Sequence, residues 1–249
     1  MKDCDQDILN MMDILDLPLA IDKYKELIDD PNLCNYSFPQ LIRELLTPQY
    51  HDKVNSRYET NLRLSKLINK GASIEKLKSG NGRLYNDVTV QQILSFSFAA
   101  DRKNVGVYGV TAAGKSYFLS ACCNEACRLN YRCKFIDYCE LLDELIALNN
   151  KPDLSHYQKR LKYYARIQLL FIDDFAISRY SEEGIKILYH LIKKRDDFGT
   201  STLFSCQYSP DEWGKQLSYE EGCYGKLDGI RRRLTTGYTV LIERVQNNK

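Results

Sequence analysis

The 249-residue sequence lacks any long apolar stretch, since no run approaches the ~18 residues of a membrane-spanning helix, and its acidic N-terminus shows no signal-peptide pattern. It also lacks an excess of charge of either sign, because 35 Lys and Arg face 33 Asp and Glu, for a net charge of +2. A nearly neutral chain gives no global argument for nucleic-acid binding, which must then rest on local patches. We expect a cytoplasmic protein without membrane contact.

C-x-x-C pairs are absent as well, although the sequence has nine cysteines. The count is odd and no secretion signal precedes it, so we do not expect disulfides. Cys122, Cys123 and Cys127 lie on a segment that we predict to be helical, where small apolar thiols normally pack. We therefore expect structural thiols here rather than metal or redox centres.

The strongest motif that is present lies at residues 109–116, Gly-Val-Thr-Ala-Ala-Gly-Lys-Ser, after a short apolar run and before a helix-compatible segment. This G-x-x-x-x-G-K-S pattern is typical of a P-loop, in which glycines let backbone N–H groups approach a polyphosphate and the helix N-terminus adds its positive dipole end. Lys115 would reach the β- and γ-phosphates of ATP, and the Ser116 hydroxyl would ligate Mg²⁺. The expected nucleotide-binding residues are Gly109, Val110, Thr111, Ala112, Ala113, Gly114, Lys115, Ser116 and Tyr117.

A second motif, Leu169-Leu-Phe-Ile-Asp173-Asp174, is an apolar run that ends in two carboxylates. The run suits a strand buried on both faces, whose carboxyl end lies at the ligand edge of an open α/β sheet. We expect Asp173 to hold Mg²⁺ through water and Asp174 to orient or deprotonate the attacking water. A turn cap after a strand is the structural alternative. The next strand, 201–205, is tipped by Ser205, Cys206 and Gln207, which could sense the γ-phosphate.

The remaining periodicities divide the chain into a helical first part and an alternating second part. Before the P-loop we predict short helices on either side of Leu17-Pro18, a helix that starts at Ser37-Phe-Pro-Gln and ends before Pro48, a basic helix over 49–69, a linker over 78–87 and a helix over 88–100. After it, helices at 115–129, 139–147, 155–165 and 182–195 alternate with strands at 132–136, 169–172, 201–205 and 238–242. We expect an all-helical N-terminal domain, 1–80, and a P-loop ATPase domain, 81–249, with a parallel sheet flanked by helices.

Four stretches of the sequence carry a family resemblance. They are the P-loop stretch from Asn104, the Leu-Leu-Phe-Ile-Asp-Asp motif, residues 201–213 (Ser-Thr-Leu-Phe-Ser-Cys-Gln-Tyr-Ser-Pro-Asp-Glu-Trp) and the Arg-Arg-Leu-Thr-Thr-Gly-Tyr238 end. Together they resemble IstB-type transposition helper ATPases. That family lies close to the DnaC-type helicase loaders within the AAA+ superfamily. The resemblance covers nearly the whole chain, best over 104–242.

The resemblance implies roles for individual residues. Lys115 and Ser116 match the Walker A pair, Asp173 and Asp174 the Walker B pair, and Ser205 to Gln207 the sensor-1 position. Arg233 stands where the family has an arginine finger that reaches the ATP of a neighbouring subunit, which implies a homo-oligomer. The chain departs from the family at Arg232, where Asp is common, and has no clear match for the late sensor-2 arginine.

The family also implies that the ATPase assembly wraps DNA and that the N-terminal domain contacts a transposase or a replicative helicase. Lys159, Arg160, Lys162 and Arg166 form a candidate DNA-facing cluster, for which a solvated helix face is the alternative. The sequence thus predicts an ATP- and Mg²⁺-dependent ATPase that assembles on DNA and assists a transposase. A helicase loader and a nucleotide-binding scaffold without significant hydrolysis stay open, and a small-molecule P-loop kinase is disfavoured by the lack of a recognisable acceptor site.

Overall fold

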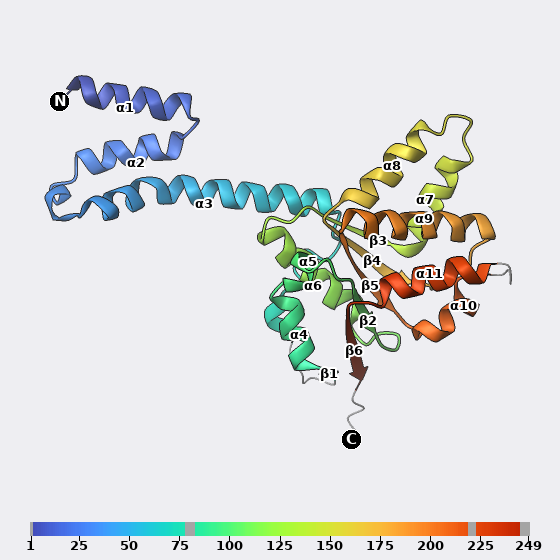
Figure 1. Cartoon of the computed structure of the whole chain (residues 1–249). Helices are drawn as coiled ribbons and strands as arrows, with labels where there is room; N and C mark the ends of the chain where they lie inside the picture. The colour runs from blue at the N-terminus through green and yellow to red at the C-terminus, as the bar shows by residue number, and fades with distance from the viewer. Residues whose placement is uncertain (1, 78–82, 219–222, 245–249) are drawn as a thin grey trace. The chain divides into compact units, whose positions relative to one another are not determined.

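The computed structural model describes residues 2–77, 83–218 and 223–244 and divides the chain into two compact units, Met1–Thr60 and Asn61–Lys249 (Figure 1). The domain boundary expected between residues 80 and 81, and the first half of the linker expected over 78–87, lie outside the described residues and stay predictions. None of the helices in the described part of the chain combines the length and apolarity needed to cross a bilayer.

Helices are the regular secondary structure of the first unit in its described residues. It contains α1 (Lys2–Ile14), α2 (Pro18–Ile28), η1 (Leu33–Asn35) and most of α3 (Phe38–Ser65). Pro18 occupies the first turn of α2, where its missing N–H costs nothing, so the predicted break at Leu17-Pro18 is confirmed. Gln49 Oε1 accepts a hydrogen bond from Leu19 N at 3.0 Å and so ties α2 to α3.

Two helix predictions in the N-terminal half are wrong. Helix α3 continues through Pro48, although an internal proline costs about 3 kcal/mol, and Thr47 Oγ1 donates to Arg43 O at 2.7 Å beside the interruption. The helix expected over 88–100 is instead split into α4 (Asp87–Leu94) and α5 (Ser97–Ala100). Phe96 turns left-handed between them, with φ +57°, because its ring is buried against Phe98 and Tyr131.

The second unit is built on a six-stranded sheet of order β1-β6-β2-β5-β4-β3, in which all neighbours are parallel except β1 with β6. The mostly parallel sheet flanked by helices confirms the predicted fold class. Its remaining elements are η2 (Ile74–Lys76), β1 (Arg83–Tyr85), β2 (Val105–Tyr108), α6 (Lys115–Arg128), β3 (Cys133–Asp137), α7 (Tyr138–Asn149), α8 (Ser155–Arg166), β4 (Leu169–Phe175), α9 (Glu182–Phe198), β5 (Ser201–Cys206), η3 (Pro210–Glu212), α10 (Trp213–Gln216), α11 (Tyr224–Leu234) and β6 (Tyr238–Arg244).

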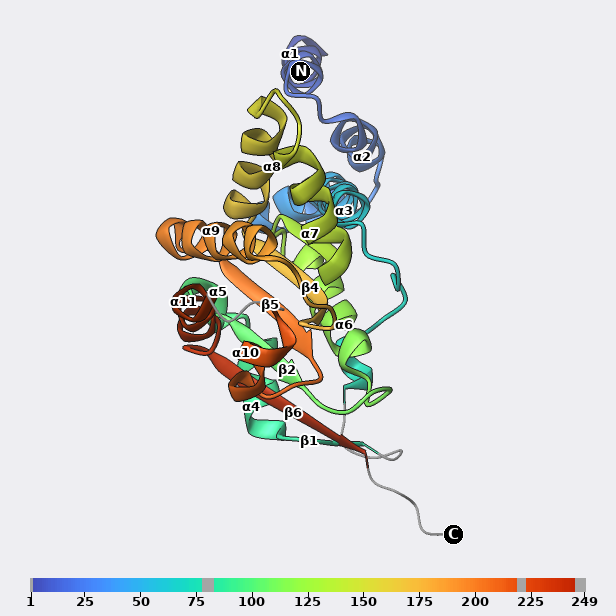
Figure 2. The ribbon, with the colours of Figure 1, turned by 90° about the vertical axis from the view of Figure 1, so that its right-hand side faces the viewer.

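Both faces of the central strands are covered. Helix α6 packs against β2, β3, β4 and β5, while α7, α8, α9 and α11 form a hydrophobic cluster with the other face (Figure 2). Along β4, Leu170 and Ile172 enter that cluster, and Phe171 stacks on Phe135 with ring centroids 6.4 Å apart. The four apolar residues that open β4, Leu169–Ile172, are therefore all buried, as the continuous apolar run predicts.

Arg195 is a fully buried cation that joins α9 to the end of α8 and the start of β5. Its guanidinium donates to Thr202 Oγ1 at 2.8 Å and to the carbonyls of Tyr164, Ile167 and Ser201, and burial lowers its pKa to about 9. The cation is thus held by neutral oxygen acceptors. Because these acceptors are buried, water cannot take the place of the guanidinium as their hydrogen-bond donor.

Replacing Arg195 by Ala is expected to destabilise the protein by about 3 kcal/mol or more, because several buried carbonyls lose their donor and a cavity forms. Urea unfolding followed by circular dichroism measures the shift in midpoint. Lys194→Ala, at an exposed position one residue earlier, is the matched control and should change stability by less than ~0.5 kcal/mol. Equal stability of the two variants would contradict this role for Arg195.

Candidate nucleotide site

The loop between β2 and α6 is shaped by its two glycines. Gly109 has φ +156°, and a Cβ placed there would come within 2.5 Å of the Ile242 carbonyl oxygen of β6. Gly114 has φ +106° at the N-cap of α6, a conformation that side chains disfavour. Ala113 is buried between them, whereas Val110, Thr111, Ala112 and Ser116 are exposed. The backbone of the loop is therefore open toward solvent at the N-terminus of a fourteen-residue helix.

Lys115 lies at the centre of this loop. Its Nζ donates to the carbonyls of Gly109 at 2.9 Å and of Val110 at 3.0 Å. Burial lowers the pKa of the ammonium group, and the nearby carboxylates of Asp174 and Asp173 partly offset that effect. Lys115 and the two carboxylates, which are distant in the sequence, are thus brought within electrostatic reach of one another.

The hydroxyl of Ser205 joins the two carboxylate residues that end β4. Ser205 Oγ donates to Asp173 Oδ1 at 2.5 Å and accepts from the Asp174 backbone N–H at 2.8 Å. A register shift between Ile172 and Phe175 accompanies this contact, and Asp174 takes a left-handed φ of +50°. Such a backbone irregularity is typical of functional sites. Because of it, the side chains of Asp173 and Asp174 leave the same sheet edge in different directions.

Gln207, just beyond β5, connects the P-loop to the carboxylates. Thr111 Oγ1 donates to Gln207 Oε1 at 2.9 Å, and hydrogen bonding with the Gln207 side chain favours the ionised form of Asp174. The sequence predicts that Gln207 is near the γ-phosphate but gives no sign of its bond to Thr111. Cys206 instead points into the core, where its thiol donates to Phe175 O at 3.1 Å.

The pKa of Asp174 is raised by burial and by the neighbouring charge of Asp173, with Lys115 acting in the opposite direction. A carboxyl group with a raised folded-state pKa binds its proton more tightly in the folded than in the unfolded chain. The ionised group therefore disfavours folding above that pKa, and this cost disappears as the pH falls through it.

We accordingly expect Asp174→Asn to be more stable than the wild type at neutral pH, and the two proteins to converge in stability as the pH falls through the raised Asp174 pKa toward the ordinary value of 3.8. Thermal unfolding at a series of pH values measures the difference. A variant that is less stable than the wild type at neutral pH would show that the Asp174 carboxylate stabilises the fold.

Two further residues expected at the site have structural contacts of their own. The Tyr117 hydroxyl accepts a hydrogen bond from Ser73 N at 3.2 Å and thereby holds the segment that precedes η2. Arg233, near the end of α11, forms an ion pair with Asp196 Oδ2 at 3.1 Å, donates to Gly229 O at 3.0 Å and lies over the Tyr189 ring. Its finger role is a prediction that requires Arg233 to leave these contacts.

The four candidate DNA-binding residues of α8 separate into two groups. Lys159, Lys162 and Arg166 border one hollow of about 520 Å³, which Arg132 also lines. Arg160 instead pairs with Glu144 at 2.6 Å and lines a second hollow, of about 650 Å³, that extends to Asp173. Arg132 was missed by the sequence analysis, because only the chain reversal between α6 and β3 brings it beside α8.

A family model described as IstB-like ATP binding protein matches residues 11–230. The chain is an IstB-like ATP-binding protein. The IstB-like chain is 24% identical over 169 residues to a protein of insertion sequence IS1162 from Pseudomonas fluorescens, covering 68% of this chain and 72% of that one. It is 21% identical over 201 residues to one of insertion sequence IS5376 from Geobacillus stearothermophilus, covering 81% and 78%. Both relatives are named for ATP binding.

Solved structures share the fold of the IstB-like chain. DnaI matches with a TM-score of 0.56 at 21% identity, over 70% of this chain and 92% of that one, and the DnaC helicase loader with 0.53 at 18%, over 70% and 97%. DnaA from Aquifex aeolicus, bound to AMPPCP, matches with 0.56 at 19% over 72% of this chain. The IstB-like chain spans about half of that DnaA chain, 51%. These likenesses show that the chain shares its fold with DnaI, the DnaC helicase loader and DnaA.

Proposed function

We propose that this protein hydrolyses ATP with Mg²⁺, assembles on DNA as a homo-oligomer and assists a transposase. The observation that carries the proposal is the convergence of Lys115, Asp173 and Asp174 at one sheet edge, with Ser205 bridging the last two. Membership of the IstB-like family and the insertion-sequence origin of the relatives support the partner.

In the proposed reaction, the loop N–H groups and Lys115 bind the phosphates. Lys115 exchanges its bonds to the Gly109 and Val110 carbonyls for phosphate oxygens, a change that costs little because one set of acceptors replaces another. Asp174 orients the attacking water or takes its proton, and its raised pKa brings it closer to the range that suits a general base. Thr111 and Gln207 couple the P-loop to β5.

The donor set fits Mg²⁺, which prefers hydroxyl, carboxylate and water oxygens. The exposed Ser116 hydroxyl is available for it at the start of α6, and among the hydrogen bonds of the described residues Asp173 uses only Oδ1. When bound, Mg²⁺ would neutralise phosphate charge in the transition state. Ser205 holds the Asp173 carboxylate in orientation for this role.

DNA contact is proposed at the hollow lined by Lys159, Lys162, Arg166 and Arg132. Lys159→Ala with Lys162→Ala should weaken DNA binding and reduce the slope of log affinity against log salt by about 2, since each lost phosphate contact removes nearly one counterion. Arg160→Ala is the control, because Arg160 pairs with Glu144, and should leave the slope unchanged. If the salt dependence of the affinity changes only with Arg160→Ala, DNA binds at the second hollow and not at the first.

A helicase loader is the second candidate, because this chain aligns with 92% of DnaI and 97% of the DnaC loader. The two candidates differ in the partner and in the preferred DNA form, duplex for a transposition helper and single strand for a loader. The experiment that tests the proposal is steady-state ATP turnover with and without each DNA form. Turnover stimulated by duplex supports the transposition role, stimulation by single strand alone supports the loader, and no turnover leaves a nucleotide-binding scaffold.

A further inference from the structure

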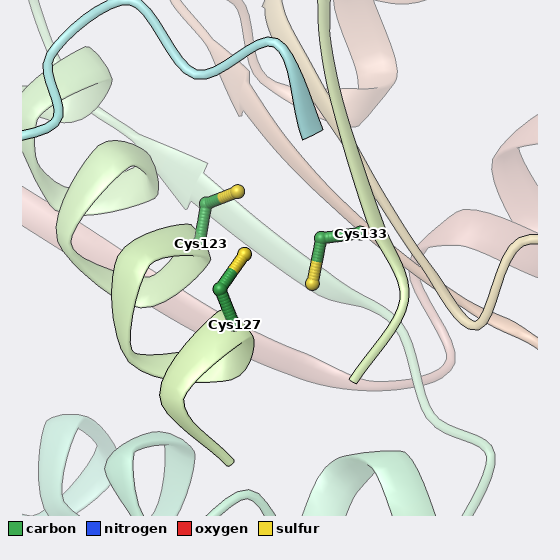
Figure 3. A group of neighbouring side chains, drawn as sticks. All are labelled: Cys123, Cys127 and Cys133. Carbon is green, nitrogen blue, oxygen red and sulfur yellow. The ribbon is translucent and has the colours of Figure 1, made fainter. Parts of the chain in front are cut away.

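Three buried cysteines meet at the C-terminal end of the P-loop helix. Cys123 and Cys127 lie one turn apart on α6, and Cys133 is the first residue of β3. Figure 3 shows the three side chains directed toward a common space between helix and strand. Their sulfur atoms all lie within 4.8 Å of one another, and the three residues are buried.

The chain reversal after α6 creates this cluster. Residue Asn130 takes a left-handed φ of +64°, and the backbone N–H groups of Asn130 and Tyr131 close the helix on the carbonyls of Cys127 and Ala126. Strand β3 therefore starts beside the last turn of α6. The three cysteines are not spaced as a C-x-x-C motif. Only the fold therefore reveals that the Cys133 thiol lies beside those of Cys123 and Cys127.

Two features beside the thiols suit a bound cation. The C-terminal end of a helix carries partial negative charge, which attracts cations. The Ser65 hydroxyl lies within hydrogen-bonding reach of Cys123 and Cys127 and provides an oxygen beside the sulfurs.

The dimensions suit a thiophilic metal ion. A Zn–S bond of about 2.3 Å in tetrahedral geometry places ligand sulfurs about 3.8 Å apart. Because 4.8 Å is the upper limit of the sulfur separations here, a contraction of about 1 Å at most is enough to bring the three atoms onto one ion.

We propose that Cys123, Cys127 and Cys133 bind one Zn²⁺ ion as thiolates, with the Ser65 hydroxyl or a water molecule in the fourth position. Each thiol releases its proton as its Zn–S bond forms, so no oxidant or reductant takes part. The ion ties the P-loop helix to β3, which is an edge strand of the sheet. The site is independent of the ATPase reaction and stabilises the helix that carries Lys115 and Ser116 at its other end.

The test uses the full chain, reduced and freed of metal, then loaded with Zn²⁺ or with the spectroscopic probe Co²⁺. We expect one zinc per chain after gel filtration, a sulfur-to-cobalt charge-transfer band of a multi-thiolate site, and a rise of about 5 °C in the unfolding midpoint at saturating Zn²⁺. The cobalt spectrum of the wild-type chain tests the site even where a variant fails to fold.

Cys127→Ser and Cys133→Ser should each lose the bound zinc and the rise in the midpoint. Cys122→Ser is the matched control, because Cys122 is a buried thiol on the same helix that lies outside the cluster, and it should keep both. Cys34 is an exposed thiol at which adventitious binding must be excluded, so Cys34→Ser should also keep both. A wild-type chain that retains no zinc, or shows no thiolate band with Co²⁺, would overturn the proposal and leave three packed thiols.

Discussion

Asp174→Asn is expected to lower ATP turnover by about a thousandfold while ATP still binds, because an amide cannot accept the proton of the attacking water. The substitution preserves the size of the side chain and leaves Lys115, Ser116 and the Asp173–Ser205 bond in place. It also removes the repulsion between two adjacent carboxylates, which raises the Asp174 pKa. Equilibrium binding of a fluorescent ATP analogue and phosphate release measure the two properties separately.

Asp137 offers the matched control for this prediction. It ends β3 opposite Asp173 in the register of the sheet, and its carboxylate caps α7 by accepting from Cys139 N at 2.7 Å. Asparagine is an equally good cap, so Asp137→Asn should retain both the fold and turnover. If Asp174→Asn hydrolyses ATP like the wild type, or if both variants lose turnover to the same extent, Asp174 is not the general base.

Arg233→Ala is expected to reduce turnover by a factor of about 10³ or more within the oligomer, the loss typical of a missing arginine finger. ATP binding to the monomer should be unaffected, because the finger acts on the nucleotide of the neighbouring subunit. Arg232→Ala is the control, since Arg232 is exposed one residue earlier on α11. Loss of turnover with Arg232→Ala alone would assign the finger to Arg232 and leave Arg233 with its structural ion pair to Asp196.

Mixing subunits separates a role in trans from a defect in folding. An Arg233→Ala subunit keeps Lys115 and Asp174, and an Asp174→Asn subunit keeps Arg233. If the arginine acts between subunits, the mixture should recover turnover that neither variant shows alone. No recovery, with both variants still able to co-assemble, would contradict action in trans.

From the P-loop onward, the sequence predicts most of the helices and strands of the second unit closely, because its periodicities coincide with buried contacts. The run Leu169–Ile172 is apolar at every position since both faces of β4 are covered, and the P-loop glycines are needed where Ile242 approaches Gly109. The prediction fails at Pro48 and Phe96. At the first a helix tolerates an internal proline, and at the second burial of an aromatic ring reverses the local backbone.

The site is predictable only where its residues are close in sequence or belong to a motif. Lys115 and the Asp173-Asp174 pair are identified by pattern, and the resemblance implies the same roles for them. Three other features depend on how distant segments are brought together. They are the hydrogen bond from Thr111 to Gln207, the hollow that Arg132 and Lys159 both line, and the proximity of the Cys133 and Cys127 sulfur atoms. No local propensity encodes such contacts, because tertiary packing decides them.

Nucleotide-dependent assembly on DNA is the central claim, and size-exclusion chromatography with light scattering tests it most directly. The chain is run with ATP, with ADP and without nucleotide, each in the presence of duplex DNA, single-stranded DNA or none. We predict a large particle with ATP and duplex DNA that does not form with ADP. A chain that stays monomeric under every condition would contradict both the role of Arg233 in trans and delivery of a transposase.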